Sequence, residues 1–187
     1  MILLGITGHP SAGKDTVADY LVHQHGFIFV STSDMIRDEI KHRSLGEPTR
    51  DLMHTVVNEL RAEKGPDVLV KRSVEKFKDA PRLCLGGIRA IGEAQTIQTL
   101  GGSIVVVTAP LEIRFARMQA RGRTGDGATL EEFKEKEEKE TANAKPEAQN
   151  VSGIIAMADY TISNEGDRTK LETQLDAMMT ELVGKAL

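Results

Sequence analysis

Aromatic residues are scarce in this sequence, which has no tryptophan, five phenylalanines and two tyrosines. Proteins that bind single-stranded nucleic acid stack the bases on aromatic side chains, so this function is disfavoured. The net charge of −4 also gives no overall positive charge for a nucleic-acid backbone. We therefore expect the partner of this chain to be a small molecule and not a nucleic acid.

Cysteine and long hydrophobic runs are also scarce. The single cysteine, Cys84, lies in the apolar run "RLCLG", where a buried strand position is expected, and it has no partner for an intrachain disulfide. No apolar run approaches the roughly 20 residues that span a bilayer. The first ten residues lack the charged flank and cleavage site of a secretory signal. We expect a cytoplasmic protein with no membrane partner.

Short apolar strands alternate with amphipathic helices along the 187 residues. Strands are predicted over residues 2–7, 27–30, 82–86, 103–109 and 160–164. Helices are predicted over residues 13–26, 32–43 (capped by Ser33 or Asp34), 47–65, 67–81, 90–102, 110–123, 129–142 and 167–187. This alternation is typical of a single α/β domain with a mostly parallel sheet between two layers of helices. In the last helix, the expected buried face consists of Leu171, Leu175, Met178, Met179 and Leu182.

The stretch "GITGHPSAGKDT" at residues 5–16 is close to the phosphate-binding pattern G-x-x-x-x-G-K-[ST], with Gly8, Gly13 and Lys14 in place. It lies between a predicted strand and a predicted helix, as such a loop requires. Backbone N–H groups and the helix N-terminus attract phosphate, and a lysine at this position can reach the β- and γ-phosphates. We therefore predict a nucleotide site made of Gly8, His9, Pro10, Ser11, Ala12, Gly13, Lys14, Asp15 and Thr16.

Asp15 departs from this pattern, because it stands where a Ser or Thr hydroxyl usually holds Mg²⁺. A carboxylate is itself a good oxygen ligand for Mg²⁺. An acidic residue is also favourable in the first turn of a helix, whether or not it binds metal. Asp15 is therefore either a magnesium ligand, with Thr16 beside it, or a residue that starts the helix. The hydroxyl of Thr16 can also meet an α-phosphate.

Two further stretches are candidates for binding an acceptor. "VSTSDMIRDE" follows the second strand, and Thr32, Asp34 and Arg37 offer oxygen atoms and a guanidinium group there. "LGGIRAIGE" ends the third strand and places Arg89 at the carboxyl edge of the sheet, where ligands bind in open α/β folds. Each stretch also has a plain structural interpretation, as a capped helix or a structural arginine.

"RFARMQARGRTGDG" contains Arg114, Arg117, Arg121 and Arg123, and the last three are the candidates for catalysis. Arg117 and Arg121 are four residues apart and share a helix face. Arginines at such a place can stabilise the charge on a transferring phosphoryl group. The glycines at 122, 125 and 127 suggest a hinge for a lid. The charged run "EEFKEKEEKE" that follows is interpreted as a solvated helix.

Taken together, these segments resemble the P-loop nucleoside monophosphate kinases, the group that includes adenylate kinase. "STSDMIR" is similar to the segment with which adenylate kinases grip the acceptor, with Thr32 and Arg37 at matching positions. "GGIR" resembles a shortened D-G-F-P-R, in which Arg89 would bind the acceptor phosphate. "RMQAR" resembles the paired catalytic arginines that precede the lid.

The C-terminal stretch "ADYTISNEGDRTKLETQL" is closer to dephospho-CoA kinases, in which the loop after the last strand contacts adenine. Asn164, Glu165 and Gly166 match that loop. Over the whole chain, the sequence is most similar to an archaeal adenylate-kinase-like family of unsettled activity. The shared segments are "EPT", "ELRAEKGPD", "GGIR", "RGR" and "ADYTISNEG".

The resemblance implies a three-layer P-loop NTPase fold with a five-stranded parallel sheet in the order 2-3-1-4-5. It implies one kinase domain over 1–187, with a helical acceptor-binding insert at 33–80 and a short lid region at 122–146. ATP and Mg²⁺ would be the cofactors and a nucleotide the acceptor. The protein would be a monomer or a homodimer.

Two features depart from the family. Gly86 stands where the family has an aspartate that helps to hold Mg²⁺ through water. The lid lacks the usual second set of arginines, so Arg121, Arg123 and Lys134 would have to serve. The leading hypothesis is transfer of the γ-phosphoryl group of ATP to an AMP-like acceptor. The alternatives are a dephospho-CoA kinase and a nucleotide-binding regulator or slow ATPase that uses no acceptor.

Overall fold

The five predicted strands form one parallel sheet in the computed structural model, which describes residues 1–122, 129–141 and 150–185. The strands are β1 (Ile2–Thr7), β2 (Ile28–Ser31), β3 (Arg82–Gly86), β4 (Ser103–Thr108) and β5 (Tyr160–Ser163). Their order is β2-β3-β1-β4-β5, and every neighbouring pair is parallel. The predicted fold class and strand order are confirmed.

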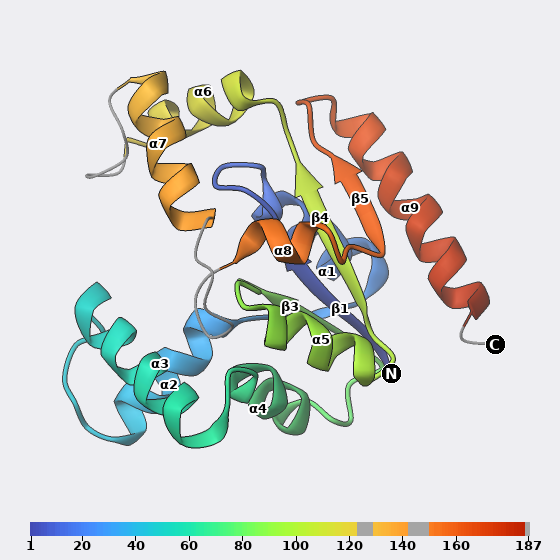
Figure 1. Ribbon diagram of the computed structural model, residues 1–187. Coiled ribbons are helices and arrows are strands. Elements are labelled where there is room, and N and C mark those ends of the chain that lie inside the picture. The colour runs from blue at the N-terminus through green and yellow to red at the C-terminus, as the bar shows by residue number, and fades with distance from the viewer. Residues whose placement is uncertain (123–128, 142–149, 186–187) are drawn as a thin grey trace.

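Helices cover both faces of this sheet, and α6 and α7 lie beyond the carboxyl ends of its strands (Figure 1). The helices of the described residues are α1 (Lys14–His25), α2 (Thr32–His42), α3 (Arg50–Lys64), α4 (Val68–Lys76), α5 (Ile91–Thr99), α6 (Leu111–Arg121), α7 (Leu130–Thr141), α8 (Val151–Ile155) and α9 (Arg168–Lys185). Among these helices, none combines the length and the apolar character needed to cross a membrane.

The core consists of two apolar layers, one on each face of the sheet. Leu3 and Val106 face one layer, formed with α2 to α5 and α8, whereas Leu4 and Val105 face the other, formed with α1 and α9. A strand buried on both faces has no polar side to show, which explains why β1 and β4 are continuous apolar runs. Cys84 is buried as predicted, and so is the whole predicted face of α9.

Some helix boundaries differ from the prediction. α2 begins at Thr32, because the hydroxyl of Ser31 accepts a hydrogen bond from the N–H of Ser33 (3.3 Å); neither Ser33 nor Asp34 is the cap. α3 begins only at Arg50, where the hydroxyl of Thr49 caps it. The short helix α8 was not predicted, because five residues contain too little periodicity to reveal a helix.

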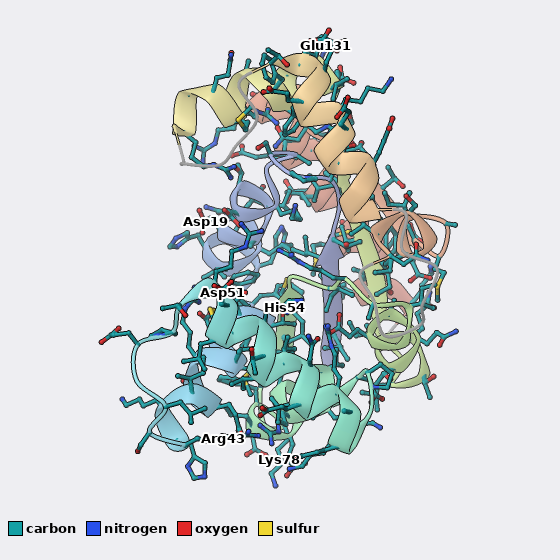
Figure 2. The ribbon with its side chains drawn as sticks, turned by 60° about the vertical axis from the view of Figure 1, so that its left-hand side comes forward. Asp19, Arg43, Asp51, His54, Lys78 and Glu131 are labelled. Carbon is teal, nitrogen blue, oxygen red and sulfur yellow. The ribbon has the colours of Figure 1, made fainter. Side chains whose placement is uncertain are left out.

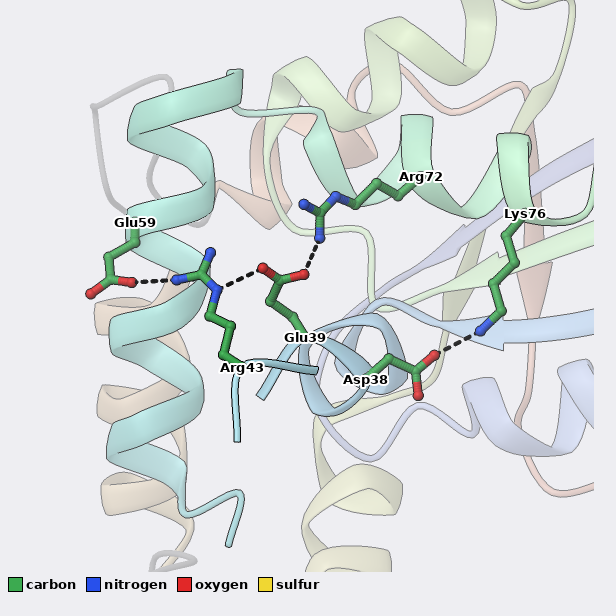
Figure 3. Close-up of polar contacts among 6 residues, drawn as sticks. All are labelled: Asp38, Glu39, Arg43, Glu59, Arg72 and Lys76. Atoms are coloured by element: carbon green, nitrogen blue, oxygen red, sulfur yellow. Dashed lines mark hydrogen bonds and ion pairs between the residues drawn. The ribbon is translucent and has the colours of Figure 1, made fainter. Parts of the chain in front are cut away.

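A network of ion pairs joins α2, α3 and α4, the helices between β2 and β3 (Figure 3). Glu39 of α2 accepts hydrogen bonds from Arg43 (2.7 Å) and from Arg72 of α4 (2.5 Å). Arg43 also contacts Glu59 of α3 at 2.9 Å. Burial alone would raise the pKa of Glu39, but the hydrogen bonds from Arg72 and Arg43 outweigh it and hold the pKa below its ordinary value. The mostly buried carboxylate of Glu39 is therefore the centre of the network.

Substituting Glu39 with alanine should lower the free energy of unfolding by about 2 kcal/mol, because two arginines lose their shared partner. Since the pKa of Glu39 is depressed, its contribution should be fully present above the ordinary carboxyl pKa, start to decline below it, and be lost as the pH falls through the lower pKa of the folded protein. Urea unfolding at pH 7 and pH 4 measures both effects. The control is Glu75→Ala, whose exposed pair with Lys78 should contribute less than about 0.5 kcal/mol. Equal losses in the two variants would contradict this account.

Candidate active site at the phosphate-binding loop

The loop between β1 and α1 has backbone angles that only glycine adopts easily. Gly8 has φ 138° and Gly13 has φ 93°. A Cβ atom on Gly8 would overlap the carbonyl oxygen of Val107, and one on Gly13 would overlap the amide of Asn164. Ser11 also has a positive φ of 59°, and its buried hydroxyl has no hydrogen-bond partner in the described part of the chain. Such strain and such unpaired groups are typical of functional loops.

Lys14 lies at the end of this loop, where its ammonium group donates to the carbonyl oxygens of Gly8 (3.0 Å) and His9 (2.9 Å). Burial, followed by the charge of Arg89, lowers the pKa of Lys14 to about 8, although Asp15 opposes the shift. The charges of Arg114 and Arg121 lower the pKa further. The fold thus brings the predicted residues Lys14, Arg89 and Arg121 to one place.

Arg89 is held there by a buried carboxylate. Glu93 of α5 is completely buried, and its Oε2 accepts hydrogen bonds from the backbone N–H groups of Arg89 (2.9 Å) and Ala90 (3.1 Å). Its Oε1 accepts a hydrogen bond from Arg61 of α3 (3.0 Å). Glu93 therefore fixes the backbone of the β3–α5 loop and ties it to α3. Its position three residues after the helix cap is a sequence signal for this role, although Glu93 was not among the predicted residues.

Arg117 braces the loop. Its guanidinium group donates to the carbonyl oxygen of Ala12 (3.3 Å) and to the backbone and side-chain oxygens of Asn164 (3.1 and 3.2 Å). The amide of Asn164 donates to the same carbonyl of Ala12 (2.9 Å). The phosphate-binding loop is thereby fastened to the loop after β5.

A pocket of about 230 Å³ lies beside Arg117 and Asn164. Its lining combines parts of the predicted nucleotide site with residues of α6 and α9: Gly13, Thr16, Arg117, Asn164, Gly166, Arg168 and Leu171. Glu165, also predicted for this site, accepts a hydrogen bond from the hydroxyl of Ser163 (3.0 Å) at the surface.

Of the residues predicted to bind the acceptor, Thr32, Asp34 and Arg37 form a hydrogen bond and an ion pair with groups other than Lys14. The hydroxyl of Thr32 donates to the carbonyl oxygen of Gly87 (3.2 Å) and so supports the β3–α5 loop. Arg37 pairs with Asp34 at 2.7 Å, and both side chains are exposed. Arg123 and two parts of the predicted lid region 122–146, residues 123–128 and 142–146, lie outside the described residues, whereas α7 belongs to the described part.

The ring of Phe29 would have to shift if Gly86 were the aspartate found in the related kinases. A Cβ atom there would lie 2.5 Å from the ring of Phe29 on β2, so the aromatic ring fills the space that a side chain would need. Asp15, in contrast, is exposed and near enough to Lys14 to influence its pKa. Mg²⁺ often takes one or two protein oxygens together with substrate phosphates and waters, and Asp15 with Thr16 fits such a partial set of ligands.

Two charged residues at this site were not among the predicted site residues, although Arg114 belongs to the arginine-rich stretch that supplied the catalytic candidates. Arg114 is one turn before Arg117 on α6 and almost completely buried. Glu137 belongs to the charged run that was interpreted as solvated, yet it contacts both Arg114 and His9. For Glu137, the one sequence feature that could have indicated an inward position was its spacing of four residues from Phe133, which places both on one helix face.

Comparisons with known proteins show the family of the chain. A family model described as an AAA domain matches residues 7–134. A UPF0200 protein of Thermococcus kodakarensis is 32% identical, covering 96% of this chain and 97% of the relative. A UPF0200 protein of Methanothermobacter thermautotrophicus is 31% identical, with coverage of 99% and 93%.

Two solved structures share the fold. Shikimate kinase from Bacteroides thetaiotaomicron has a TM-score of 0.61 at 15% identity, covering 97% of this chain and 98% of its own. The protein TT1252 from Thermus thermophilus has a TM-score of 0.64 at 24% identity, covering 97% of each chain. At these identities the likeness establishes the fold alone.

Binding of a nucleotide at pH 9 should be accompanied by proton uptake. The pKa of Lys14 is about 8, so the amine is mostly neutral at pH 9, and an anionic phosphate beside it favours the ammonium form. At pH 7 the group is already protonated, and the uptake should be small. Calorimetric titration with ADP in two buffers of different ionisation enthalpy measures it.

Lys14→Arg is the matched control, because arginine stays protonated at both pH values. The uptake at pH 9 should disappear in this variant, whereas binding remains measurable. Equal proton uptake by the two proteins would show that the shifted pKa belongs to another group.

Proposed function

The chain belongs to the AAA-domain family and to the UPF0200 family of archaeal proteins, and from this premise we propose that it is an ATP-dependent kinase of nucleoside monophosphates, with AMP-like acceptors favoured. The observation that carries the proposal is the gathering of positive charge around Lys14, from Arg89, Arg114 and Arg121. Two phosphorylated substrates that meet end to end need such a site, because their negative charges must be neutralised together.

The proposed roles follow from where each residue lies. Lys14 and the N–H groups of the loop bind the β- and γ-phosphates of ATP. Arg89, which lies in the β3–α5 loop, binds the phosphate of the acceptor. Arg121 stabilises the negative charge of the phosphoryl group during its transfer. The pocket beside Arg117 and Asn164 accommodates the nucleoside of ATP.

Asp15 and Thr16 are the proposed ligands of Mg²⁺, which would neutralise charge between the β- and γ-phosphates. The chain itself contributes position: the in-line transfer needs donor and acceptor held in one geometry, without a covalent enzyme intermediate. Thr32 supports the loop that presents Arg89. Asp34 and Arg37 would bind the acceptor only after their mutual ion pair separates.

A slow ATPase or nucleotide-binding regulator is the second candidate. It is favoured by one observation, the ring of Phe29 in the space where related kinases have an aspartate side chain. A protein of this kind would bind or turn over ATP at a rate that no acceptor increases. Dephospho-CoA remains an alternative acceptor because of the C-terminal resemblance.

The test is ATP turnover with Mg²⁺, alone and with a panel of ribonucleoside and deoxyribonucleoside monophosphates and dephospho-CoA. We expect AMP or a close analogue to accelerate turnover. Arg89→Met should lower kcat/KM for that acceptor about 100-fold, because a charge-assisted contact to phosphate is lost.

Lys78→Met is the matched control for loss of a positive charge, since Lys78 is exposed at the opposite end of the molecule from α7 (Figure 2). It should leave turnover unchanged. If no acceptor changes the rate of ATP hydrolysis, the kinase proposal is wrong and the second candidate takes its place. Acceleration by dephospho-CoA alone would reassign the acceptor.

A further inference from the structure

Helix α7 has one buried face despite its charged sequence. Phe133 is 5% exposed, and Glu137 follows it four residues later on the same face. The glutamates at 131, 132, 135 and 138 are exposed, and Figure 2 shows Glu131 at the outer end of the helix. α7 therefore directs one apolar and one acidic side chain toward the body of the protein.

The carboxylate of Glu137 joins three parts of the structure. Its Oε1 lies 2.9 Å from Nδ1 of His9 in the phosphate-binding loop. Its Oε2 accepts a hydrogen bond from Arg114 of α6. Arg114 is itself fixed, because its Nε donates to the carbonyl oxygen of Ala109 (2.9 Å) and its guanidinium group lies 5.8 Å from the centre of the Phe133 ring.

The contact with His9 bears directly on the geometry of the loop. The carbonyl oxygen of His9 accepts hydrogen bonds from the ammonium group of Lys14 (2.9 Å) and from the N–H of Ala12 (3.3 Å). A change in the position of His9 would therefore also move the groups that face the phosphates. Glu137, which is distant in sequence, is connected to these loop groups through His9.

We propose that Glu137 is a positioning residue for the phosphates of the nucleotide: by bridging His9 and Arg114 it holds the first half of the phosphate-binding loop against α6 and α7. This rests on the proposed binding of a nucleotide at that loop. Glu137 orients other groups and has no bond-making role.

The protonation of Glu137 agrees with a positioning role. Burial would raise the pKa of this carboxyl group, but the contacts with His9 and Arg114 outweigh it and lower the pKa to about 2. A carboxylate with so low a pKa is a weak proton acceptor at neutral pH. It is, however, always charged there, so that its contact with Arg114 persists.

The opposite expectation is that Glu137 occupies the place of a phosphate and competes with the nucleotide. The two ideas differ in their response to two substitutions. Glu137→Gln removes the charge, but its amide oxygen can still accept from Arg114 and its amide nitrogen can donate to His9. Glu137→Ala removes both the charge and the hydrogen bonds.

The experiment is calorimetric titration of MgADP into the wild type, Glu137→Gln and Glu137→Ala at pH 7.5, with melting temperatures recorded for each. We expect Glu137→Ala to weaken binding about tenfold or more, the loss typical of a hydrogen bond to a charged group. Glu137→Gln should stay within about threefold of the wild type, because it keeps the bridge. Glu131→Ala, on the exposed side of α7, is the control and should bind normally.

The double variant His9→Ala/Glu137→Ala tests the connection itself. If Glu137 acts through His9, the double variant should bind no more weakly than the weaker single variant. Additive losses would overturn the proposal, as would unchanged binding by Glu137→Ala. Tighter binding by both Glu137 variants would also overturn it, in favour of competition with phosphate.

Failure of the inference can be told apart from failure of the proposed function. If the wild type does not bind MgADP, the proposed function is wrong and the inference falls with it. If the wild type binds and Glu137→Ala binds equally well, only the inference is wrong. Should Glu137→Ala melt far below the wild type, the comparison of His9→Ala with Glu137→Gln decides, since His9→Ala must then weaken binding while Glu137→Gln does not.

Discussion

Burial of positive charge at the carboxyl edge of the sheet, beside further positive charges, is the constraint on which the site depends. Lys14 is half-buried; burial lowers its pKa most, and the charges of Arg89, Arg114 and Arg121 lower it further against the opposing charge of Asp15. Cations that lie this close are unfavourable unless other groups fix and neutralise them. The loop carbonyls hold Lys14, and Glu137 holds Arg114. The arrangement costs stability in the free protein, and anionic phosphates would relieve that cost.

The sheet topology explains how these charges meet. β1, β3 and β4 are parallel neighbours, so the segments that follow them emerge at one edge. These segments contain Lys14, Arg89 and Arg114, respectively. Glu93 then fixes the second segment and ties it to α3, and Arg117 fastens the first to the loop after β5. The site is therefore assembled from the segments that follow these strands and from the hydrogen bonds that join them.

The strands, the buried face of α9 and the phosphate-binding loop were predictable because each has a local pattern: an apolar run, a helical period or a glycine spacing. The place of Arg89 beside Lys14 followed from its position after β3, and Arg121 was singled out by its helical spacing from Arg117. Glu137 was not predictable, because one inward carboxylate among many exposed charges leaves no distinct period. The ring of Phe29 over Gly86 was also hidden, since it depends on the register between β2 and β3. Such contacts between distant segments are set by packing, which no local pattern records.

The most direct test of this account is urea unfolding of the wild type and Lys14→Met at pH 7, with and without MgATP. If the positive charge of Lys14 lowers the stability of the nucleotide-free protein, Lys14→Met should be more stable than the wild type without nucleotide, because a buried charge has been removed. With MgATP the order should reverse, because ligand binding stabilises only the protein that retains Lys14. A variant that is less stable without nucleotide, yet is stabilised by MgATP as much as the wild type, would contradict the account.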